Sequence, residues 1–165
     1  MSKQTDLAYL AGLVDGEGCI RVKKCKPQKS NGAKNPCYQA MIQVRMVDEQ
    51  ALEFLATVLG GWYYKEKPHS CEGKPLYCFQ ASCRAAEHIL NQLLPYLRVK
   101  RACAQNVLAL RTLQKESRKH RTKIVGKRAF PNQYGTVRFV ANKRLSDEYL
   151  AMCESLYQRS KELNS

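Results

Sequence analysis

The chain of 165 residues carries 28 Lys and Arg against 14 Asp and Glu, for a formal net charge of +14 and a pI of about 9.6. This length suits one domain with a real core. The charge predicts a polyanionic partner, either nucleic acid or, as the alternative, an anionic membrane surface. Because no apolar run approaches the roughly 20 residues of a membrane span and the N-terminus lacks a signal-peptide layout, we expect an intracellular protein with no membrane insertion.

Eight cysteines are spread along the chain without a CxxC pair, at positions 19, 25, 37, 71, 78, 83, 103 and 153. Several fall within expected strands and helices rather than in a loop framework, so we predict free thiols in a reducing compartment. A zinc site built from His69, Cys71, Cys78 and Cys83 is the alternative. Its spacings miss the usual pattern of short ligand pairs.

The first predicted elements are a short helix and a hairpin. Residues 6–14 place apolar side chains at helical spacing, with Thr5 or Asp6 available as a cap. Residues 19–26 and 37–46 alternate between apolar and polar positions and are separated by turn-forming residues. The expected polar face of this hairpin carries Arg21, Lys23 and Cys25 on the first strand and Gln39, Gln43 and Arg45 on the second.

The next elements repeat this order. A helix is predicted over residues 48–61, with acids in its first turn and glycines at its end. Residues 62–68 and 74–82 predict a second hairpin, and residues 83–97 a helix that stops near Pro95. The expected polar face of this hairpin carries Tyr63, Lys65 and Lys67. The order helix, strand, strand, helix, strand, strand, helix predicts an α+β fold with one four-stranded antiparallel sheet.

The C-terminal part is predicted as an extension of this core. Residues 100–117 are helical in pattern, and an amphipathic helix ends the chain at about 146–163. Between them, about 116–145 is rich in Lys, Arg and turn formers, and predicts a basic loop region with one strand at its GTVRFV segment. We therefore expect a single domain over residues 1–165, whose core spans about 5–115.

The expected polar face of the two hairpins combines cations with amides. Arg and Lys can pair with guanine edges and Gln with adenine, and a twisted two-stranded ribbon is narrow enough for the DNA major groove. The face therefore predicts a DNA-reading surface. An ordinary solvated sheet face is the alternative, and the excess of cations over acids on these strands favours nucleic acid.

Two acids stand among glycines where the first helix meets the first strand. Gly12 and Gly16 lie on one helix face, where the missing side chains let another backbone come close. An acid here, Asp15 or Glu17, beside a cationic groove, can hold Mg²⁺ through oxygen ligands and water against a phosphate. By spacing alone, a helix end followed by solvated acids is the simpler explanation.

Residues 10–18, LAGLVDGEG, resemble the signature of the LAGLIDADG homing endonucleases. The predicted element order is similar to that family's fold, in which the signature helix precedes a saddle-shaped four-stranded antiparallel sheet. The similarity extends over residues 5 to about 115. A second stretch, residues 95–108, resembles the family's segment in which a lysine of the catalytic site precedes a helix, and here that lysine is Lys100.

A single signature in a short chain resembles the homodimeric branch of the family, in which two chains pack their signature helices together. The dimer interface that this implies is formed by Leu10, Ala11, Gly12, Leu13 and Gly16. The resemblance also implies that Glu17, the motif's last acid, and the Gly16 carbonyl hold Mg²⁺, for which Mn²⁺ can substitute. Lys100 would stabilise charge near the scissile phosphate. The family usually has Asp where Glu17 stands, and Asp15 would support the helix end.

The activity implied by the resemblance is metal-dependent hydrolysis of both strands of a long, near-palindromic DNA target, with no small-molecule substrate. The expected DNA contacts are Arg21, Lys23, Cys25, Gln39, Gln43, Arg45, Tyr63, Lys65, Lys67, Arg98 and Arg101. Met46 stands where the family often has a Gln, with Gln43 and Gln50 nearby, so the residue that positions the water is unassigned. Two alternatives stay open: an inactive member of the same fold that binds DNA or intron RNA, and a basic protein that binds nucleic acid without sequence preference.

Overall fold

The computed structural model describes residues 3–27, 35–67, 75–116, 122–131 and 137–165. Within these ranges the chain forms helices and strands in the order α1 (Lys3–Glu17), β1 (Gly18–Cys25), β2 (Cys37–Met46), α2 (Glu49–Leu59), β3 (Trp62–Lys65), β4 (Tyr77–Ser82), α3 (Cys83–Leu93), α4 (Arg101–Glu116), β5 (Thr122–Pro131), β6 (Val137–Leu145) and α5 (Asp147–Glu162). None of the helices so described is both long and apolar enough to cross a lipid bilayer.

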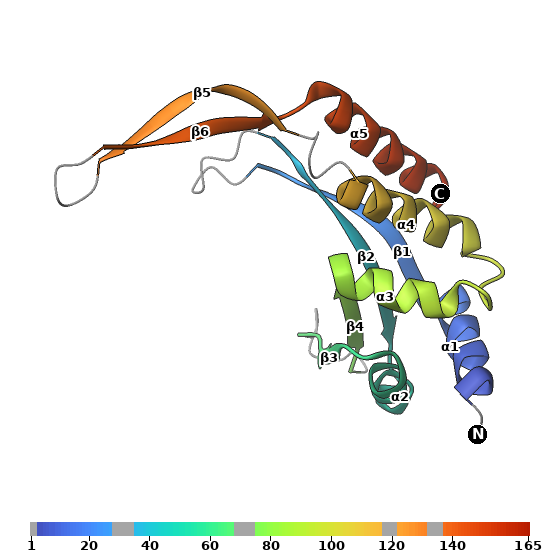
Figure 1. Ribbon diagram of the computed structural model, residues 1–165. Coiled ribbons are helices and arrows are strands. Elements are labelled where there is room, and N and C mark those ends of the chain that lie inside the picture. The colour runs from blue at the N-terminus through green and yellow to red at the C-terminus, as the bar shows by residue number, and fades with distance from the viewer. Residues whose placement is uncertain (1–2, 28–34, 68–74, 117–121, 132–136) are drawn as a thin grey trace.

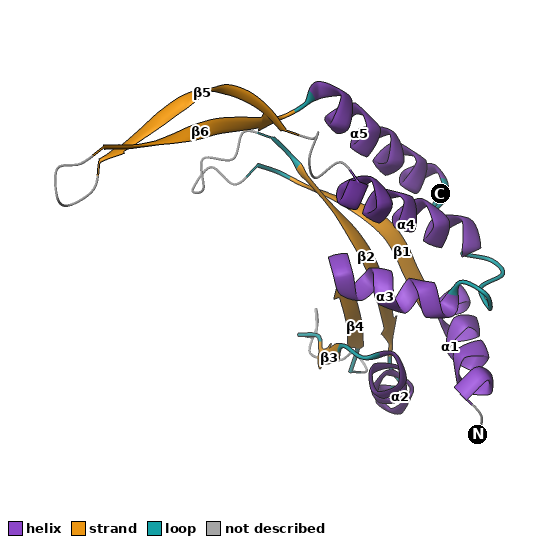
Figure 2. Ribbon diagram, in the orientation of Figure 1, coloured by secondary structure: helices purple, strands orange, loops and turns teal. Residues whose placement is uncertain are grey.

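The first four strands form one antiparallel sheet in the order β1-β2-β4-β3, which confirms the predicted fold class. β1 and β2 pair along their whole length, from Gly18 opposite Val44 to Cys25 opposite Cys37. The two strands are long and curved, and the helices gather on one side of the sheet (Figures 1 and 2). The other side of the sheet is left open along the inside of the curve.

The core lies between this sheet and helices α1–α4. Alternate residues of a strand point to opposite faces, so Ile20, Ile42 and Ala81 share one face across three strands and are buried there. The helices cover that face with apolar side chains, most of them fully buried: Leu10, Val14, Leu52, Leu55, Ile89, Leu90, Leu93, Val107 and Leu110. The apolar positions that the helical and strand periodicities predict therefore pack together in one core.

Two predictions about the elements were wrong. The first helix was expected to end at residue 14, but α1 continues to Glu17, because buried Leu10 and Val14 anchor it and a lysine ammonium bonds its last carbonyls. The region about 116–145 was expected as a basic loop with one strand, but it forms two paired strands, β5 and β6. Lys and Arg occupy positions of both parities there, which hides the alternation that normally marks a strand.

Helix α5 lies along β1, an edge strand of the sheet. Ser146 caps the helix as its side chain accepts a hydrogen bond from the Tyr149 backbone. At the other end, the Ser160 hydroxyl accepts a hydrogen bond from the Val22 amide at 2.9 Å, and the Asn164 side chain donates to the Ile20 carbonyl at 3.2 Å. The helix thus satisfies backbone groups on the outer edge of β1, which would otherwise be open to pairing with another strand.

Candidate functional site

The end of α1 presents an exposed carboxylate. Glu17 is the last residue of the helix, and among the described residues nothing donates a hydrogen bond or forms an ion pair with its side chain. Gly18 then starts β1 directly. A Cβ at Gly18 would lie 2.5 Å from the Val14 carbonyl oxygen, so only glycine allows the chain to pass at once from helix to strand. The register places Glu17 at the edge of the sheet where β2 ends.

Lys100 comes from far along the chain to the same helix end. Its Nζ donates hydrogen bonds to the carbonyls of Val14 at 3.1 Å, Asp15 at 2.7 Å and Gly16 at 3.2 Å. The last carbonyls of a helix have no partner within the helix, and a cation is favoured beside them. The fold therefore brings Lys100 to the end of the helix that carries Gly16 and Glu17.

Asp15 holds the loop that carries Lys100. One carboxylate oxygen accepts from the amides of Arg98 at 2.8 Å and Val99 at 3.2 Å, and the other from the Lys100 amide at 2.8 Å. Partial burial opposes ionisation of Asp15, but hydrogen bonds from the Arg98, Lys100 and Val99 amides outweigh it and lower the pKa. Asp15 is thus an ionised anchor between α1 and the start of α4.

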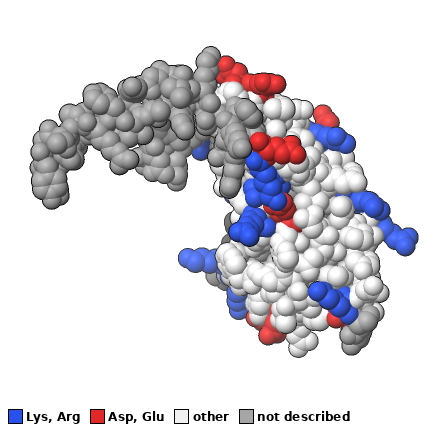
Figure 3. Space-filling model, in the orientation of Figure 1, with Lys and Arg blue, Asp and Glu red and all other residues white. Residues whose placement is uncertain are grey.

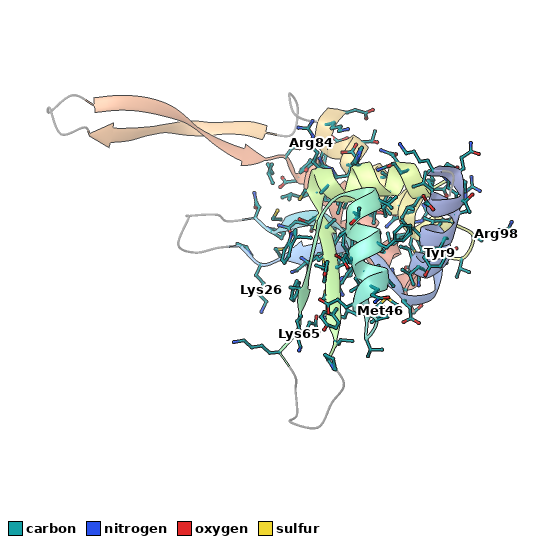
Figure 4. The ribbon with its side chains drawn as sticks, turned by 90° about the horizontal axis from the view of Figure 1, so that it is seen from below. Tyr9, Lys26, Met46, Lys65, Arg84 and Arg98 are labelled. Atoms are coloured by element: carbon teal, nitrogen blue, oxygen red, sulfur yellow. The ribbon has the colours of Figure 1, made fainter. Side chains whose placement is uncertain are left out.

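The outer face of α1 differs from the predicted dimer interface. Leu10 and Ala11 are fully buried in the protomer's own core, so their assignment to a surface between two chains was wrong. Successive helical residues point in different directions, and Gly12 and Gly16 face outward instead. A Cβ at either glycine would meet no atom of the described residues within 4 Å. Tyr9 is 56% exposed beside them, at the opposite end of the molecule from Lys26 and Lys65 (Figure 4).

A groove of about 580 Å³ runs beside this face of α1. Its lining residues are Ala8, Gly12, Asp15, Pro95, Tyr96, Leu97, Arg98 and Arg101. Arg98 and Arg101, which were expected to contact DNA, therefore lie at the α1 end of the protein and not on the open face of the sheet. Both are exposed and add positive charge close to the Asp15 loop.

The open face of the sheet carries most of the residues expected on the first hairpin. The register puts Arg21 opposite Met41 and Lys23 opposite Gln39, and both cations are exposed. Cys25 and Gln39 are partly buried on the same face. Several Lys and Arg side chains lie along the hollowed side of the molecule, and others lie on its outer side (Figure 3). The exposed Arg21 and Lys23 give the open face of the sheet its positive charge.

Two members of this face are less available than the alternation suggested. Gln43 lies on the open face as expected, but it is only 7% exposed and its amide donates to the Cys78 sulfur at 3.1 Å, so the expectation that it is exposed was wrong. Arg45 is exposed but pairs with Glu66 at 2.9 Å. To contact DNA, Gln43 would have to break its bond to Cys78, and Arg45 its ion pair with Glu66.

The polar face of the second hairpin was assigned to the wrong residues. Tyr63 lies opposite core residue Phe79 and packs against the core, and Lys65, two residues on, belongs to the same helix-covered face. Lys67 is exposed but lies beyond the end of β3. Trp62 and Tyr64 take the positions on the open face, with ring centroids 5.2 Å apart. A shift of one residue exchanges the two faces of a strand, and only the pairing with buried Phe79 decides which is correct.

Two further expectations concern the water-positioning residue and zinc. Met46 packs against the core, and Gln50 is exposed at the start of α2, so neither fills the missing role on the open face. His69 and Cys71 of the alternative zinc site lie outside the described residues. In the part of the chain that the structure describes, no three His, Cys, Asp or Glu side chains are grouped to hold a metal.

Comparisons with known proteins agree with this geometry. The sequence model described as LAGLIDADG endonuclease matches residues 10–117, so the chain belongs to this family. A sequence search among curated proteins gave no significant match.

Several solved structures with a similar fold are homing endonucleases. The homing endonuclease I-CvuI in complex with its target, in the presence of calcium, has a TM-score of 0.68 at 21% identity, over 98% of this chain and 83% of that one. I-TnaI has a TM-score of 0.58 at 14% identity, over 99% and 96%. The archaeal intron-encoded I-Vdi141I, complexed with DNA, has a TM-score of 0.55 at 16% identity, over 70% and 72%. The predicted family and fold are confirmed.

Proposed function

We propose that the protein is a site-specific homing endonuclease that acts as a homodimer, in a reducing intracellular compartment, and cuts both strands of a long, near-palindromic DNA target. The observation that carries this proposal is the Glu17 carboxylate. It is exposed at the end of the signature helix, beside Lys100, and no described residue engages it. DNA complexes of I-CvuI and I-Vdi141I support double-stranded DNA as the substrate.

The proposed dimer follows from the outer face of α1. Gly12 and Gly16 leave open space on this face, and exposed Tyr9 and partly exposed Leu13 offer apolar surface beside it. A second copy of α1 can approach closely where side chains are missing. Packing two copies there would bring two Glu17 carboxylates to the same place. Each chain would then supply half of the reacting site.

The ligand atoms fit a hard divalent cation in such a dimer. The Glu17 carboxylate and the Gly16 carbonyl are oxygen donors of the kind that Mg²⁺ prefers, and two chains would pool two of each. When bound, Mg²⁺, or Mn²⁺ in its place, would polarise the phosphate and activate water. The Gly16 carbonyl also accepts the hydrogen bond from Lys100, so the ammonium would lie beside the metal ligands. Crystals of I-CvuI with Mg and with Ca are in keeping with a divalent ion.

The remaining residues of the proposed site bind and orient DNA. Asp15 holds the loop that places Lys100 near the scissile phosphate, where its positive charge opposes the charge that develops on the phosphate oxygens. Arg21 and Lys23 lie exposed on the open sheet face and would neutralise phosphates or contact base edges. Arg98 and Arg101 would act at the α1 end, close to the centre of the dimer.

A cleavage selection on a randomised DNA library tests the activity. With Mg²⁺ or Mn²⁺ we expect double-strand cuts at one family of related sequences, and with Ca²⁺ binding alone. Glu17→Gln should bind the selected DNA within about twofold of the unmodified protein and cut it at least about 1,000-fold more slowly, because one ligand and its charge are lost. Glu53→Gln, an exposed acid on α2, is the matched control and should cut normally.

Two results would contradict the proposal. Cleavage by Glu17→Gln at the rate of the unmodified protein would show that Glu17 is not part of the catalytic site. Sequence-specific binding without cleavage in either metal would instead favour the inactive nucleic-acid-binding member of the fold.

Sedimentation of the free protein tests the dimer. Gly12→Leu should leave the fold intact, since a Cβ there meets no atom of the described residues within 4 Å, and should convert dimers to monomers and abolish cleavage. Ala85→Leu adds a similar side chain at an exposed position of α3 and should stay dimeric. A Gly12→Leu protein that still sediments as a dimer would rule out this face as the interface.

A further inference from the structure

We infer that β5 and β6 form a basic arm that binds duplex DNA beyond the segment covered by the four-stranded sheet. The arm consists of residues 122–131 and 137–145. The inference deepens the proposed function, because it assumes DNA on the open face of the sheet. It assigns a ligand to a part of the chain that this function leaves unexplained.

The arm is placed to extend the DNA-binding surface outward. It projects past the described ends of β1 and β2, away from the α1 end of the molecule (Figures 1 and 4). A strand of ten residues spans about 33 Å, close to the length of ten base pairs. In the described chain the two strands pair with each other, and no other described element packs extensively against either one. A two-stranded ribbon alone is marginally stable in water, so it gains most from a ligand.

The register concentrates the arm's cations on one face. The two strands together contain six Lys and Arg. Four of them share one face, called here the cationic face: Lys123, Arg128, Arg138 and Arg144. A one-residue bulge between Ile124 and Gly126 shifts the alternation of β5, and this shift places Arg128 rather than Lys127 on the cationic face.

The sequence around the arm contains no acid to balance its cations. Lys123 and Arg144 are directly opposite each other, and Arg128 and Arg138 are diagonal neighbours across the ribbon. Like charges in such pairs are destabilising. Residues 117–146 contain no Asp or Glu to compensate them. A polyanion with regularly spaced charges, such as a phosphate backbone, would convert this repulsion into binding energy.

Duplex DNA suits the arm better than duplex RNA. The major groove of B-DNA admits a two-stranded ribbon, whereas the major groove of an A-form RNA helix is deep and narrow. The arm also continues outward from the sheet that is proposed to lie on DNA. We therefore assign it to the DNA flanking each half of the target.

Paired charge variants of the full-length protein test the arm. Lys123→Gln/Arg144→Gln removes two charges from the cationic face, and Lys127→Gln/Lys143→Gln removes two from the opposite face. The probe is a 60-base-pair duplex of mixed sequence in Ca²⁺, titrated over a range of salt. The logarithm of the binding constant falls linearly with the logarithm of the salt concentration, and the cationic-face variant should make this slope less steep by about 0.9 for each phosphate that it no longer neutralises, or about 1.8 per arm. The opposite-face variant should change the slope much less. Equal decreases in the two variants would overturn the inference.

Footprinting on DNA recovered from the cleavage selection gives the second readout. The unmodified protein should protect up to about ten base pairs beyond each side of the segment protected by a variant in which a Gly/Ser linker replaces residues 123–144. Identical footprints would overturn the inference, as would a larger effect of the cationic-face variant on an RNA duplex than on DNA. The mixed-sequence titration requires neither cleavage nor a specific target, so failure of the proposed function would remain distinguishable from failure of the arm.

Discussion

Replacing Asp15 with Asn tests the anchor that joins the signature helix to the Lys100 loop. The carboxylate accepts three backbone hydrogen bonds, two on one oxygen and one on the other. Asn keeps one oxygen and replaces the other with an amide that donates. At least one of the three backbone N–H groups must then face another donor, and the remaining bonds lose the assistance of the negative charge.

The size of the effect follows from these bonds. A hydrogen bond to a charged group contributes roughly 1.5–3 kcal/mol, and the partial exposure of Asp15 favours the lower end. One broken bond and two weakened ones predict a decrease of about 2–3 kcal/mol in the free energy of unfolding at pH 7. For a chain of this length that corresponds to a fall in Tm of roughly 5–10 °C. Cleavage should also slow, because the loop no longer holds Lys100 in place.

Urea unfolding of both proteins at fixed protein concentration, between pH 7 and pH 3, measures the decrease in the free energy of unfolding and tests whether the charge of Asp15 causes it. Because the folded-state pKa of Asp15 lies below its ordinary value of 3.8, its stabilisation is fully present above that value and is lost as the pH falls through the folded-state pKa. Asn does not titrate, so the difference between the two proteins should shrink below about pH 4.

Asp48→Asn is the control for the anchor. Asp48 caps α2 through one hydrogen bond to the Ala51 amide, a role that Asn fills equally well, and we expect no loss of stability. A decrease of less than about 0.5 kcal/mol for Asp15→Asn, or a difference that does not change with pH, would refute the reasoning.

Two further predictions concern α5. Glu154 accepts hydrogen bonds from Lys24 and Tyr38, which lower its pKa to about 2. Glu154→Gln should therefore lower the free energy of unfolding by about 1 kcal/mol at neutral pH, and this difference should vanish as the pH falls from 4.5 toward 2. A difference that persists at the lowest pH would contradict the prediction. Ser160→Ala leaves the buried Val22 amide without its acceptor and should lower the free energy of unfolding by about 1–2 kcal/mol in urea titrations. The control Ser155→Ala, on the exposed side of α5, should have almost no effect. Equal effects of the two substitutions would contradict the contact between α5 and the edge of β1.

The sequence by itself determined the kinds of elements, their order and the family. Helical spacing of Leu7, Leu10 and Val14, and alternation along β1 and β2, are local properties with periods near 3.6 and 2, so they can be read without knowing the fold. The signature around Gly12 to Gly18 is also a local string. For the same reason Lys100 could be matched to a role before its contact with α1 was known.

Tertiary structure alone decided which faces of these elements are exposed. The four residues of β3 allow two assignments of faces, and the choice came from pairing with Phe79, whose burial depends on α2. Leu10 and Ala11 look like candidates for a helix interface until the sheet buries them. The cations of the arm fall at positions of both parities and hide its alternation, and the register, with its bulge, depends on the partner strand. Pairing and burial are set by residues distant in the chain, and a local pattern contains no information about them.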